Sequence, residues 1–299
     1  MTEDLRVGYI GLGAMGGALA RRLLQSRPLH VHDRSETAMQ ALCEAGATRT
    51  DSAADLGRAC DVAMICVPRS ADVRAVVFGP GGLTEGLEPG KIVVDQTSGD
   101  PAETRRIARE LAERGVLMAD APVSGGARGA AAGTIAIMAG GAPEVLDRLR
   151  PVFDDIGPNV TRCGGIGAGQ AMKLVNNMIS TCNRLAMLDG VTMGLKAGLD
   201  LDVMAEVLNA GGARSRATEV FLQKLAQGQP PSDFALDLML KDLDLAVSLA
   251  QESRVPFQFG QLARGVLQAA VNSLDEGAKL EEIAGFVAAQ AGTGFGPDR

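Results

Sequence analysis

Lys173 and Asn177 lie in the segment GGIGAGQAMKLVNN, residues 164–177, where several glycines precede a helical pattern. Their spacing of four residues places an ammonium and a carboxamide on one face of the predicted helix. A sheltered lysine can take or give a proton, and a neighbouring amide can orient it and bond a substrate. The alternative is a solvated polar stripe on the helix surface, and the pattern alone leaves both interpretations open.

Other residue types that enzymes use for proton transfer are scarce or badly placed. The two histidines, His30 and His32, fall in the second predicted strand, and the single tyrosine, Tyr9, falls in the first. The five cysteines form no CxxC pair and no cluster with histidine, so no metal site is expected. If the chain transfers a hydride, a lysine or a carboxylate must handle the proton, which makes Lys173 the leading candidate.

A GxGxxG pattern near the N-terminus predicts a dinucleotide site. It directly follows the strand-like run LRVGYIG, residues 5–11, and opens a helical pattern, which is the context that this fingerprint requires. The first glycine would permit a tight turn, the second would let a pyrophosphate approach the main chain, and the third would let helix and strand pack closely. A plain strand–turn–helix is the alternative. The predicted cofactor loop comprises Gly11, Leu12, Gly13, Ala14, Met15 and Gly16.

Asp33 ends the second predicted strand, about 20 residues after the middle glycine, where an acidic side chain binds the adenosine ribose hydroxyls. A carboxylate there repels a 2′-phosphate, so NAD is favoured. Arg34 follows directly and would accommodate that phosphate, so NADP stays possible.

Ser124, Gly125 and Gly126 follow the end of another predicted strand in DAPVSGGARG, residues 120–129. Two glycines expose main-chain N–H groups that can form an anion-binding nest, and the serine adds a hydroxyl donor. Such a loop would hold a substrate carboxylate. A simple turn between two strands is the alternative.

Strand and helix patterns alternate in the first part of the chain. Strands are predicted over 5–11, 29–33, 61–67, 91–97, 116–123 and 133–141, with helices over 14–26 and 101–114. After residue 165 only helices are predicted, over 168–197, 201–210, 215–227, 235–252, 258–274 and 279–290. Alternation is typical of a parallel, doubly wound sheet. We therefore predict an α/β fold, with an N-terminal NAD(P)-binding Rossmann domain, 1–165, and an all-helical substrate and oligomerisation domain, 166–299.

Composition and charge restrict the class of partner. A formal net charge of −7 and only 3% aromatic residues disfavour nucleic acid, which requires basic surfaces or stacking platforms. The N-terminal MTEDLR has no secretory-signal pattern, and no apolar run reaches about 18 residues. Unpaired cysteines fit a reducing compartment. We expect no membrane partner and a cytoplasmic location.

Four segments resemble the β-hydroxyacid dehydrogenase family in order and spacing. They are GYIGLGAMG at 8–16, DAPVSGG at 120–126, GGIGAGQAMKLVNN at 164–177 and FALDLMLKDLDLA at 234–246. The family includes 3-hydroxyisobutyrate dehydrogenase and tartronate semialdehyde (2-hydroxy-3-oxopropionate) reductase. The resemblance covers nearly the whole chain. It implies an NAD(P)-dependent enzyme that interconverts a small 3-hydroxy acid and its semialdehyde, assembled as a homodimer or homotetramer.

The resemblance also implies roles for individual residues. Lys173 matches the family's catalytic lysine and Asn177 the asparagine that assists it, while residues 124–126 match the loop that binds the substrate carboxylate. Ser98, in DQTSGDP, matches a Ser or Thr near the nicotinamide ribose, although Thr97 before it departs mildly from the family pattern. The remaining matches are Val67 and Pro68, in a loop along the cofactor, and Lys241, which closes over the cofactor.

Several alternatives remain at this point. In NAGGARSRATE, residues 209–219, Arg216 stands where the family often carries an aromatic residue, and Arg214 lies two residues before it. If either points into the pocket, the substrate would carry a second anionic group, whereas the simpler interpretation is two surface arginines at a helix start. A tartronate semialdehyde reductase is the closest competing activity. A catalytically silent dinucleotide-binding sensor is the alternative from another class. Such a sensor would keep the glycine loop without needing Lys173.

Overall fold

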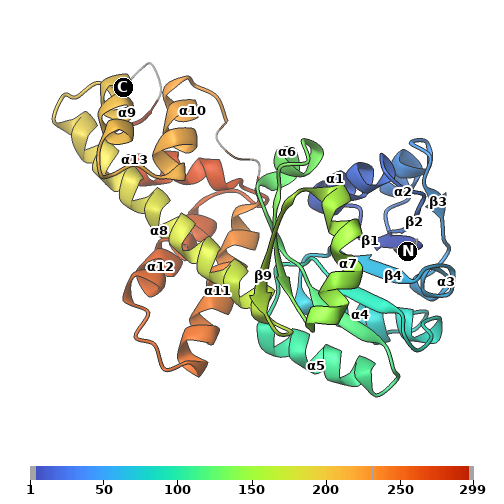
Figure 1. Cartoon of the computed structure of the whole chain (residues 1–299). Helices are drawn as coiled ribbons and strands as arrows, with labels where there is room; N and C mark the ends of the chain where they lie inside the picture. Colours follow the sequence, from blue (N-terminus) through green and yellow to red (C-terminus); the bar gives the residue numbers. More distant parts are fainter. Residues whose placement is uncertain (1–4, 231, 233, 296–299) are drawn as a thin grey trace. The chain divides into compact units, whose positions relative to one another are not determined.

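The structure of the protein, a computed structural model, describes residues 5–230, 232 and 234–295. It forms two compact units, Met1–Lys173 and Leu174–Arg299. The division falls inside a helix, α8 (Ala168–Lys196), which continues from the first unit into the second (Figure 1). The sequence-based domain boundary after residue 165 stays a prediction.

The first unit alternates strands and helices, as the sequence predicts. Its strands are β1 (Val7–Ile10), β2 (Leu29–His32), β3 (Thr48–Arg49), β4 (Val62–Ile65), β5 (Ile92–Asp95), β6 (Leu117–Asp120), β7 (Val123–Ser124), β8 (Ala136–Gly140) and β9 (Asn159–Gly164). Its helices are α1 (Ala14–Leu24), α2 (Glu36–Cys43), α3 (Ala53–Ala59), α4 (Ser70–Phe78), α5 (Pro101–Ala112), α6 (Gly126–Ala131) and α7 (Pro143–Ile156), with a 3₁₀ turn η1 (Leu83–Glu85). The sequence had not indicated β3, β9, α2, α3, α4, α6 or α7.

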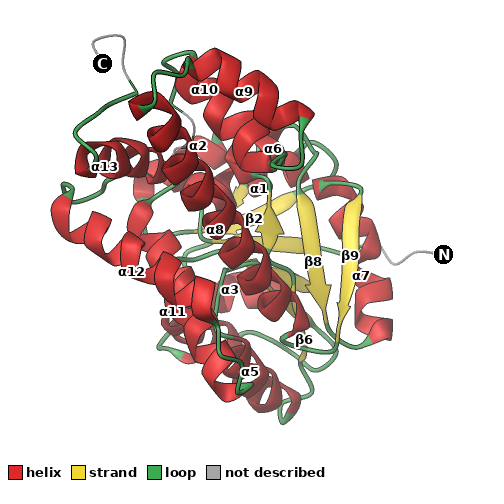
Figure 2. Ribbon diagram, turned by 90° about the vertical axis from the view of Figure 1, so that its left-hand side faces the viewer, coloured by secondary structure: helices red, strands yellow, loops and turns green. Residues whose placement is uncertain are grey.

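Within the described residues the strands form one sheet in the order β3-β2-β1-β4-β5-β6-β8-β7, with β9 paired to β8. Strands β1 to β6 are parallel, which confirms the doubly wound core. The sheet is not parallel throughout, because β8 runs antiparallel to β6 and β7. Its other neighbour, β9, runs parallel to it (Figure 2).

The single strand predicted over 116–123 is wrong, because it is divided into β6 and β7. Pro122 lies at the break and has no N–H to donate to a strand ladder. Its carbonyl instead accepts the N–H of Met138 at 3.0 Å.

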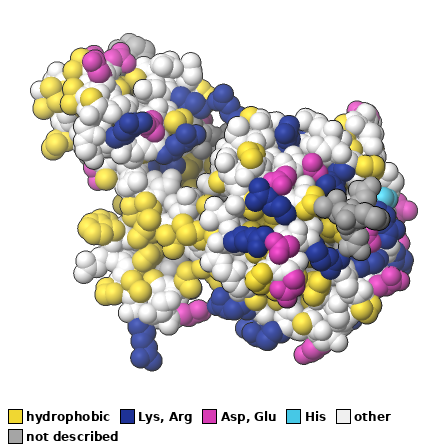
Figure 3. Space-filling view, in the orientation of Figure 1, with side chains coloured by type: hydrophobic (Ala, Val, Ile, Leu, Met, Phe, Trp, Pro, Cys, Tyr) yellow, Lys and Arg dark blue, Asp and Glu magenta, His cyan; other side chains and the backbone are white. Residues whose placement is uncertain are grey.

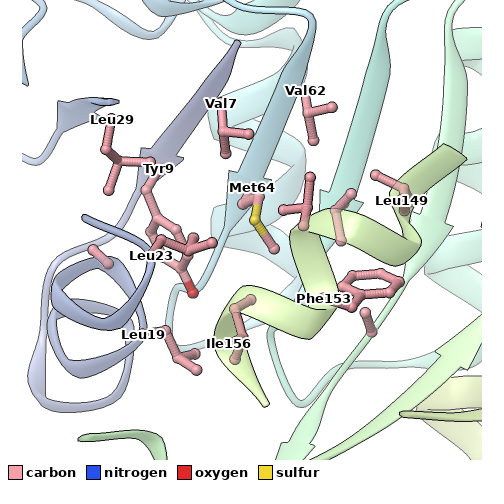
Figure 4. Close-up of a cluster of buried hydrophobic side chains, with 14 of the residues drawn as sticks. Val7, Tyr9, Leu19, Leu23, Leu29, Val62, Met64, Leu149, Phe153 and Ile156 are labelled. Carbon is pink, nitrogen blue, oxygen red and sulfur yellow. The ribbon is translucent and has the colours of Figure 1, made fainter. Parts of the chain in front are cut away.

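Alternate side chains of the parallel strands point to opposite faces of the sheet and enter two separate cores. On one face, Val62 and Met64 pack with residues of α1 and α7 such as Leu19 and Phe153 (Figure 4). On the other face, Ala63 and Ile65 pack with residues of α3, α4 and α5. Burial on both faces explains why these strands read as continuous apolar runs.

The second unit is helical and encloses a core of its own. It contains the rest of α8, then α9 (Leu201–Ala210), α10 (Gln223–Ala226), α11 (Leu236–Glu252), α12 (Gln258–Ser273) and α13 (Ile283–Gln290), with a 3₁₀ turn η3 (Leu280–Glu282). Asp200 caps α9 by accepting two main-chain N–H groups. The helix predicted over 215–227 differs, because its first part, η2 (Ala217–Leu222), is a π-helical turn.

No helix of the described residues is both long enough and apolar enough to cross a bilayer.

Candidate active site

The carboxyl ends of the central parallel strands are aligned at one edge of the sheet. Ile10 lies beside His32 on one side and Ile65 on the other, and the register continues through Asp95 to Asp120. The strand order reverses between β1 and β4, and ligands of such sheets bind at that point. Residues predicted to bind the cofactor or substrate follow these strand ends closely: Gly11, Asp33, Val67, Pro68, Ser98 and Ser124.

The glycine loop has the geometry of a dinucleotide site. Gly11 has φ +89°, and a Cβ there would lie 2.2 Å from the carbonyl oxygen of Cys66. A Cβ on Gly16 would lie 1.9 Å from the carbonyl oxygen of Gly11, so only glycine lets α1 approach the loop. A Cβ on Gly13 would meet nothing within 4 Å, and no side chain caps the start of α1 there. The open main chain at the helix N-terminus therefore suits a phosphate.

Asp33 links the second strand to the glycine loop. Its Oδ2 accepts the N–H of Leu12 at 2.5 Å, and its Oδ1 accepts the N–H of Ser35 at 2.7 Å. These bonds fix the carboxylate of a half-buried side chain beside the loop, while Arg34 is exposed. Each carboxylate oxygen can still accept a further bond, so the position suits a ribose diol.

Thr97 connects two loops at the strand ends. It is 1% exposed, and its hydroxyl accepts the N–H of Val67 at 3.2 Å. The residue that departs from the family pattern thus joins the loop of Val67 and Pro68 to the loop of Ser98, which is half-buried.

Ser124 ends β7, and the two glycines after it form the start of α6, a short helix that the sequence had not indicated. Gly125 has φ +139° and Gly126 has φ +70°, and both are exposed. A Cβ on Gly126 would meet nothing within 4 Å. The main chain at this turn is therefore open to a ligand, and Ser124 beside it is half-buried.

Lys173 and Asn177 lie one turn apart on α8, and both are buried, with 8% and 6% exposure. Apolar residues of the same helix are exposed instead: Met172 at 42%, Val175 at 45% and Ile179 at 51%. A solvated polar stripe would show the opposite distribution, so that alternative is wrong. A lysine and an amide buried on one helix face form a polar site that is sheltered from bulk water.

The amide of Asn177 is held by a carboxylate that the sequence analysis missed. Its Nδ2 donates to Asp242 Oδ2 at 2.6 Å, and its Oδ1 accepts Nδ2 of Asn176 at 3.1 Å. Asp242 is only 1% exposed. Nζ of Lys241 lies 3.0 Å from its other oxygen, as an ion pair whose angles do not make a hydrogen bond. Asp242 therefore brings two predicted site residues together within the helical unit. The repeated acid in KDLDLA was the only signal that could have suggested it.

Asp120 fixes the start of α8 and was also missed. Its carboxylate accepts the N–H of Gly167 at 2.6 Å and of Gln170 at 2.7 Å. It is 0% exposed, and burial raises its pKa above the ordinary value, although the main-chain donors oppose that shift. Gly140 and Gly169 leave room for it, because a Cβ at either would lie within 3.0 Å of its oxygens.

Gln170 joins the same helix start to the end of β5. Its Nε2 donates to the carbonyl of Thr97 at 2.7 Å and to Asp95 Oδ2 at 3.3 Å, and its Oε1 accepts the N–H of Gly99 at 2.9 Å. Gln170 precedes Lys173 by one helical turn. These bonds therefore hold the helical turn just before Lys173 against the loop that carries Ser98.

The residues set aside as proton donors have structural partners. Tyr9 is 0% exposed, its hydroxyl donates to Gln96 at 2.7 Å, and burial raises its pKa well above the ordinary value. Nδ1 of His32 lies 3.1 Å from the carbonyl of Thr50.

Arg214 pairs with Glu219 at 2.6 Å and is exposed, as is Arg216, which favours surface arginines over pocket residues.

Comparisons with known proteins agree with this geometry. Residues 6–165 match the family model for the NAD binding domain of 6-phosphogluconate dehydrogenase. Residues 167–287 match the model described as NAD-binding of NADP-dependent 3-hydroxyisobutyrate dehydrogenase.

Curated relatives and solved structures cover most of the chain. It is 34% identical over 270 residues to 2-(hydroxymethyl)glutarate dehydrogenase of Eubacterium barkeri, covering 90% of each chain. It is 37% identical over 248 residues to 2-hydroxy-3-oxopropionate reductase of Escherichia coli K12, covering 83% of this chain and 85% of the relative. The crystal structure of 3-hydroxyisobutyrate dehydrogenase from Salmonella typhimurium has a TM-score of 0.84 at 30% identity, over 95% of this chain and 100% of that one.

These matches extend over both units, and the dinucleotide loop and buried lysine lie within them. The chain therefore belongs to the β-hydroxyacid dehydrogenase family and is an NAD(P)-dependent oxidoreductase.

Proposed function

We propose that the protein interconverts a small 3-hydroxy acid and its semialdehyde, with Lys173 as the general acid and base. The observation that carries the proposal is the burial of Lys173 and Asn177 on one face of α8, while apolar residues of that helix are exposed. Elimination of the histidines and the tyrosine as proton donors supports the same assignment.

The nicotinamide, when bound, accepts or returns the hydride. In the oxidation, the neutral amine of Lys173 takes the proton of the substrate hydroxyl while that carbon loses its hydride. In the reduction, the ammonium returns a proton to the carbonyl oxygen. Nδ2 of Asn177 has two hydrogens, of which Asp242 accepts one, so the second can be donated to the substrate oxygen.

We assign the substrate carboxylate to the turn of Ser124, Gly125 and Gly126. The support is the open main chain at two glycines with positive φ, beside a hydroxyl donor. Main-chain N–H groups in such a turn bind an anion without a nearby cation.

For the cofactor we propose NAD in preference to NADP, with the diphosphate at the glycine loop. The carboxylate of Asp33 is fixed beside that loop by two main-chain N–H groups and would repel a 2′-phosphate. The roles of Ser98, Val67, Pro68 and Lys241 near the cofactor rest on the family resemblance.

For the reacting end of the substrate, a hydroxymethyl acid like that of 3-hydroxyisobutyrate is our first choice and tartronate semialdehyde is the second, since relatives named for both cover most of this chain. We also propose a homodimer or homotetramer, because large apolar side chains are exposed on the helical unit. A cytoplasmic location stays a prediction.

The test compares Lys173→Ala with Lys196→Ala, an exposed lysine at the end of the same helix. Loss of a general acid or base lowers kcat about 100- to 10,000-fold. We expect that loss only for Lys173→Ala, with cofactor binding retained by fluorescence titration. The assay follows NAD(P)H absorbance with 3-hydroxy acids and semialdehydes. Wild-type kcat in Lys173→Ala would refute the mechanism, and no turnover of any acid by the wild type would favour the silent sensor.

A further inference from the structure

Arg184 lies in the middle of α8, inside the helical unit, and none of the roles above involves it. Its Nε and Nη1 are buried and have no hydrogen-bond partner among the described residues. The guanidinium lies over the ring of Phe221, 5.2 Å from the ring centroid. Burial lowers its pKa to about 10, which leaves it charged at neutral pH. Phe221 belongs to the π-helical turn η2, and such turns frequently mark functional sites.

A guanidinium with two buried and unused donors is costly, because the ring of Phe221 offers neither a hydrogen-bond acceptor for them nor a full opposite charge. Elsewhere this chain supplies such partners. Arg27, with 13% side-chain exposure, pairs with Asp155, and Arg74 pairs with Glu103 and Glu110. No described carboxylate pairs with Arg184, so the complementary anion is expected to come from a bound molecule.

The position of Arg184 on α8 indicates which molecule that is. Asn177, Thr181 and Arg184 lie within an arc of about 60° on one face of the helix, and Arg184 is about 10 Å along the axis from Asn177. Long helical side chains lean toward the N-terminus, which brings the guanidinium closer to Asn177. Thr181 lies between them, is 1% exposed, and its hydroxyl also has no partner among the described residues. The face thus presents two sets of donors beyond Asn177.

We propose that Arg184, with the Thr181 hydroxyl, binds a second acidic group of the substrate, so that the protein acts on 3-hydroxy acids whose side chain ends in a carboxylate. A guanidinium and a hydroxyl match a carboxylate in charge and in donor geometry. The proposal rests on the proposed function, because it places the reacting end of the substrate beside Asn177. It also replaces Arg214 and Arg216, which are exposed, as the source of recognition for a second anion.

A matched pair of substrates tests this assignment. 3-Hydroxyisobutyrate and 2-(hydroxymethyl)glutarate both have a carbon that bears a hydroxymethyl group and a carboxylate. On that carbon, 3-hydroxyisobutyrate has a methyl group, whereas 2-(hydroxymethyl)glutarate has a chain that ends in a second carboxylate. 2-(Hydroxymethyl)pentanoate has a chain of similar length without the charge. We expect wild-type kcat/KM to be highest for the diacid. In Arg184→Met, the ratio of diacid to pentanoate kcat/KM should fall about 10- to 100-fold, the range expected for losing a charged hydrogen bond, mainly through KM.

Two controls separate recognition from folding. Arg264→Met removes an arginine of the same unit that pairs with Asp244 at 2.7 Å, and it should leave the substrate ratio unchanged. Arg184→Lys keeps the charge and should retain part of the wild-type diacid-to-pentanoate ratio. It replaces Arg184→Met as the test if that variant does not fold. In thermal shift, glutarate should stabilise the wild type more than butyrate does, and Arg184→Met should abolish that difference.

Three results would overturn the inference. The first is an unchanged diacid-to-pentanoate ratio in both Arg184 variants while the acids still turn over. The second is a change of oligomeric state in Arg184→Met with the ratio retained, which would assign the cation to a carboxylate of a second copy of the chain. The third is the failure of every acid to react with the wild type, which would also refute the proposed function.

Discussion

Asp242 determines the orientation of a predicted catalytic residue while making no assigned contact with the substrate. Its carboxylate accepts from Asn177 at 2.6 Å and pairs with Lys241 at 3.0 Å. An ionised carboxylate can only accept hydrogen bonds, so it fixes which end of the Asn177 amide points toward it, namely the NH₂ group. The amide of Asn177 is thereby ready to donate its second hydrogen.

Asp242→Asn should lower kcat more than it changes KM for the substrate. The substitution removes a charged acceptor, which is worth about 1.5–3 kcal/mol, and so about 10- to 100-fold in rate. Asp244→Asn is the matched control, because Asp244 lies on the same helix with a side chain 50% exposed. Steady-state kinetics of both variants check this. Equal kcat in Asp242→Asn and the wild type would show that Asn177 needs no such support.

At the scale of elements, two glycines where the loop meets α1 have different roles. Gly16 allows the helix to pack against the loop, and Gly13 leaves space for the cofactor. A Cβ on Gly16 would lie 1.9 Å from the carbonyl oxygen of Gly11, whereas a Cβ on Gly13 would meet nothing. Gly16→Ala must displace the helix, at a cost of about 1–3 kcal/mol. Gly13→Ala occupies space that we assign to the diphosphate.

We therefore expect Gly16→Ala to lower the melting temperature by several degrees, at about 2–4 °C per kcal/mol for a domain of this size. Gly13→Ala should leave that temperature near the wild-type value and weaken NAD binding at least tenfold. Calorimetry without cofactor and fluorescence titration with NAD measure the two effects. Tight NAD binding by Gly13→Ala would place the diphosphate elsewhere.

The start of α8 should give a pH-dependent contribution to stability through Asp120. Burial raises its pKa in the folded protein, so the contribution is present below the pKa of the unfolded chain, about 3.9. It is lost as pH rises through the higher folded value. Asp120→Asn lacks this dependence, and it also turns its NH₂ group toward one of the two main-chain donors, Gly167 or Gln170, which costs about 1–3 kcal/mol.

The difference in unfolding free energy between the wild type and Asp120→Asn should therefore narrow as pH rises above about 4. Urea denaturation at a series of pH values measures it. Asp100→Asn is a comparison at a helix start where the side chain is partly exposed. If the difference in unfolding free energy widens as pH rises, the main-chain donors lower the pKa of Asp120 by more than burial raises it.

At the scale of the whole molecule, an apolar patch on the helical unit supports self-association. We define it as Val175 and Ile179 of α8 with Phe259 and Leu262 of α12, exposed by 45%, 51%, 74% and 68%. The two helices are adjacent, because Sγ of Cys182 lies 3.6 Å from the carbonyl oxygen of Phe259. Figure 3 shows hydrophobic side chains gathered on this face. Exposed apolar clusters of this kind mark interfaces.

Phe259→Glu should raise the dissociation constant of the proposed homo-oligomer at least tenfold, since a large aromatic residue in an interface contributes about 2 kcal/mol or more. Light scattering coupled to gel filtration across a range of concentrations measures this. Val207→Glu is the control, on α9 and 62% exposed. An identical mass profile for Phe259→Glu and the wild type would exclude the patch as the interface.

The sequence by itself determined the local features of the protein, which depend on residues close together in the chain. The spacing of Gly11, Gly13 and Gly16 after a strand predicts a loop whose steric demands the structure shows. The alternation of elements predicts the α/β fold, which the structure and the family confirm. The helix over 201–210 has the predicted bounds because Asp200 caps it locally. Lys173 and Asn177 share a face because helical periodicity places them there.

Only the tertiary structure decided which polar residues are buried and what binds them. Asp120 and Gly167 are 47 residues apart in sequence, Gln170 and Asp95 are 75 apart, and Asn177 and Asp242 are 65 apart. No local pattern relates such residues. The antiparallel pairing of β8 with β6 likewise joins segments separated in the chain. Arg184 reads as an ordinary helical arginine until its burial is known. Burial and long-range pairing depend on how all the elements pack, so they were settled in three dimensions.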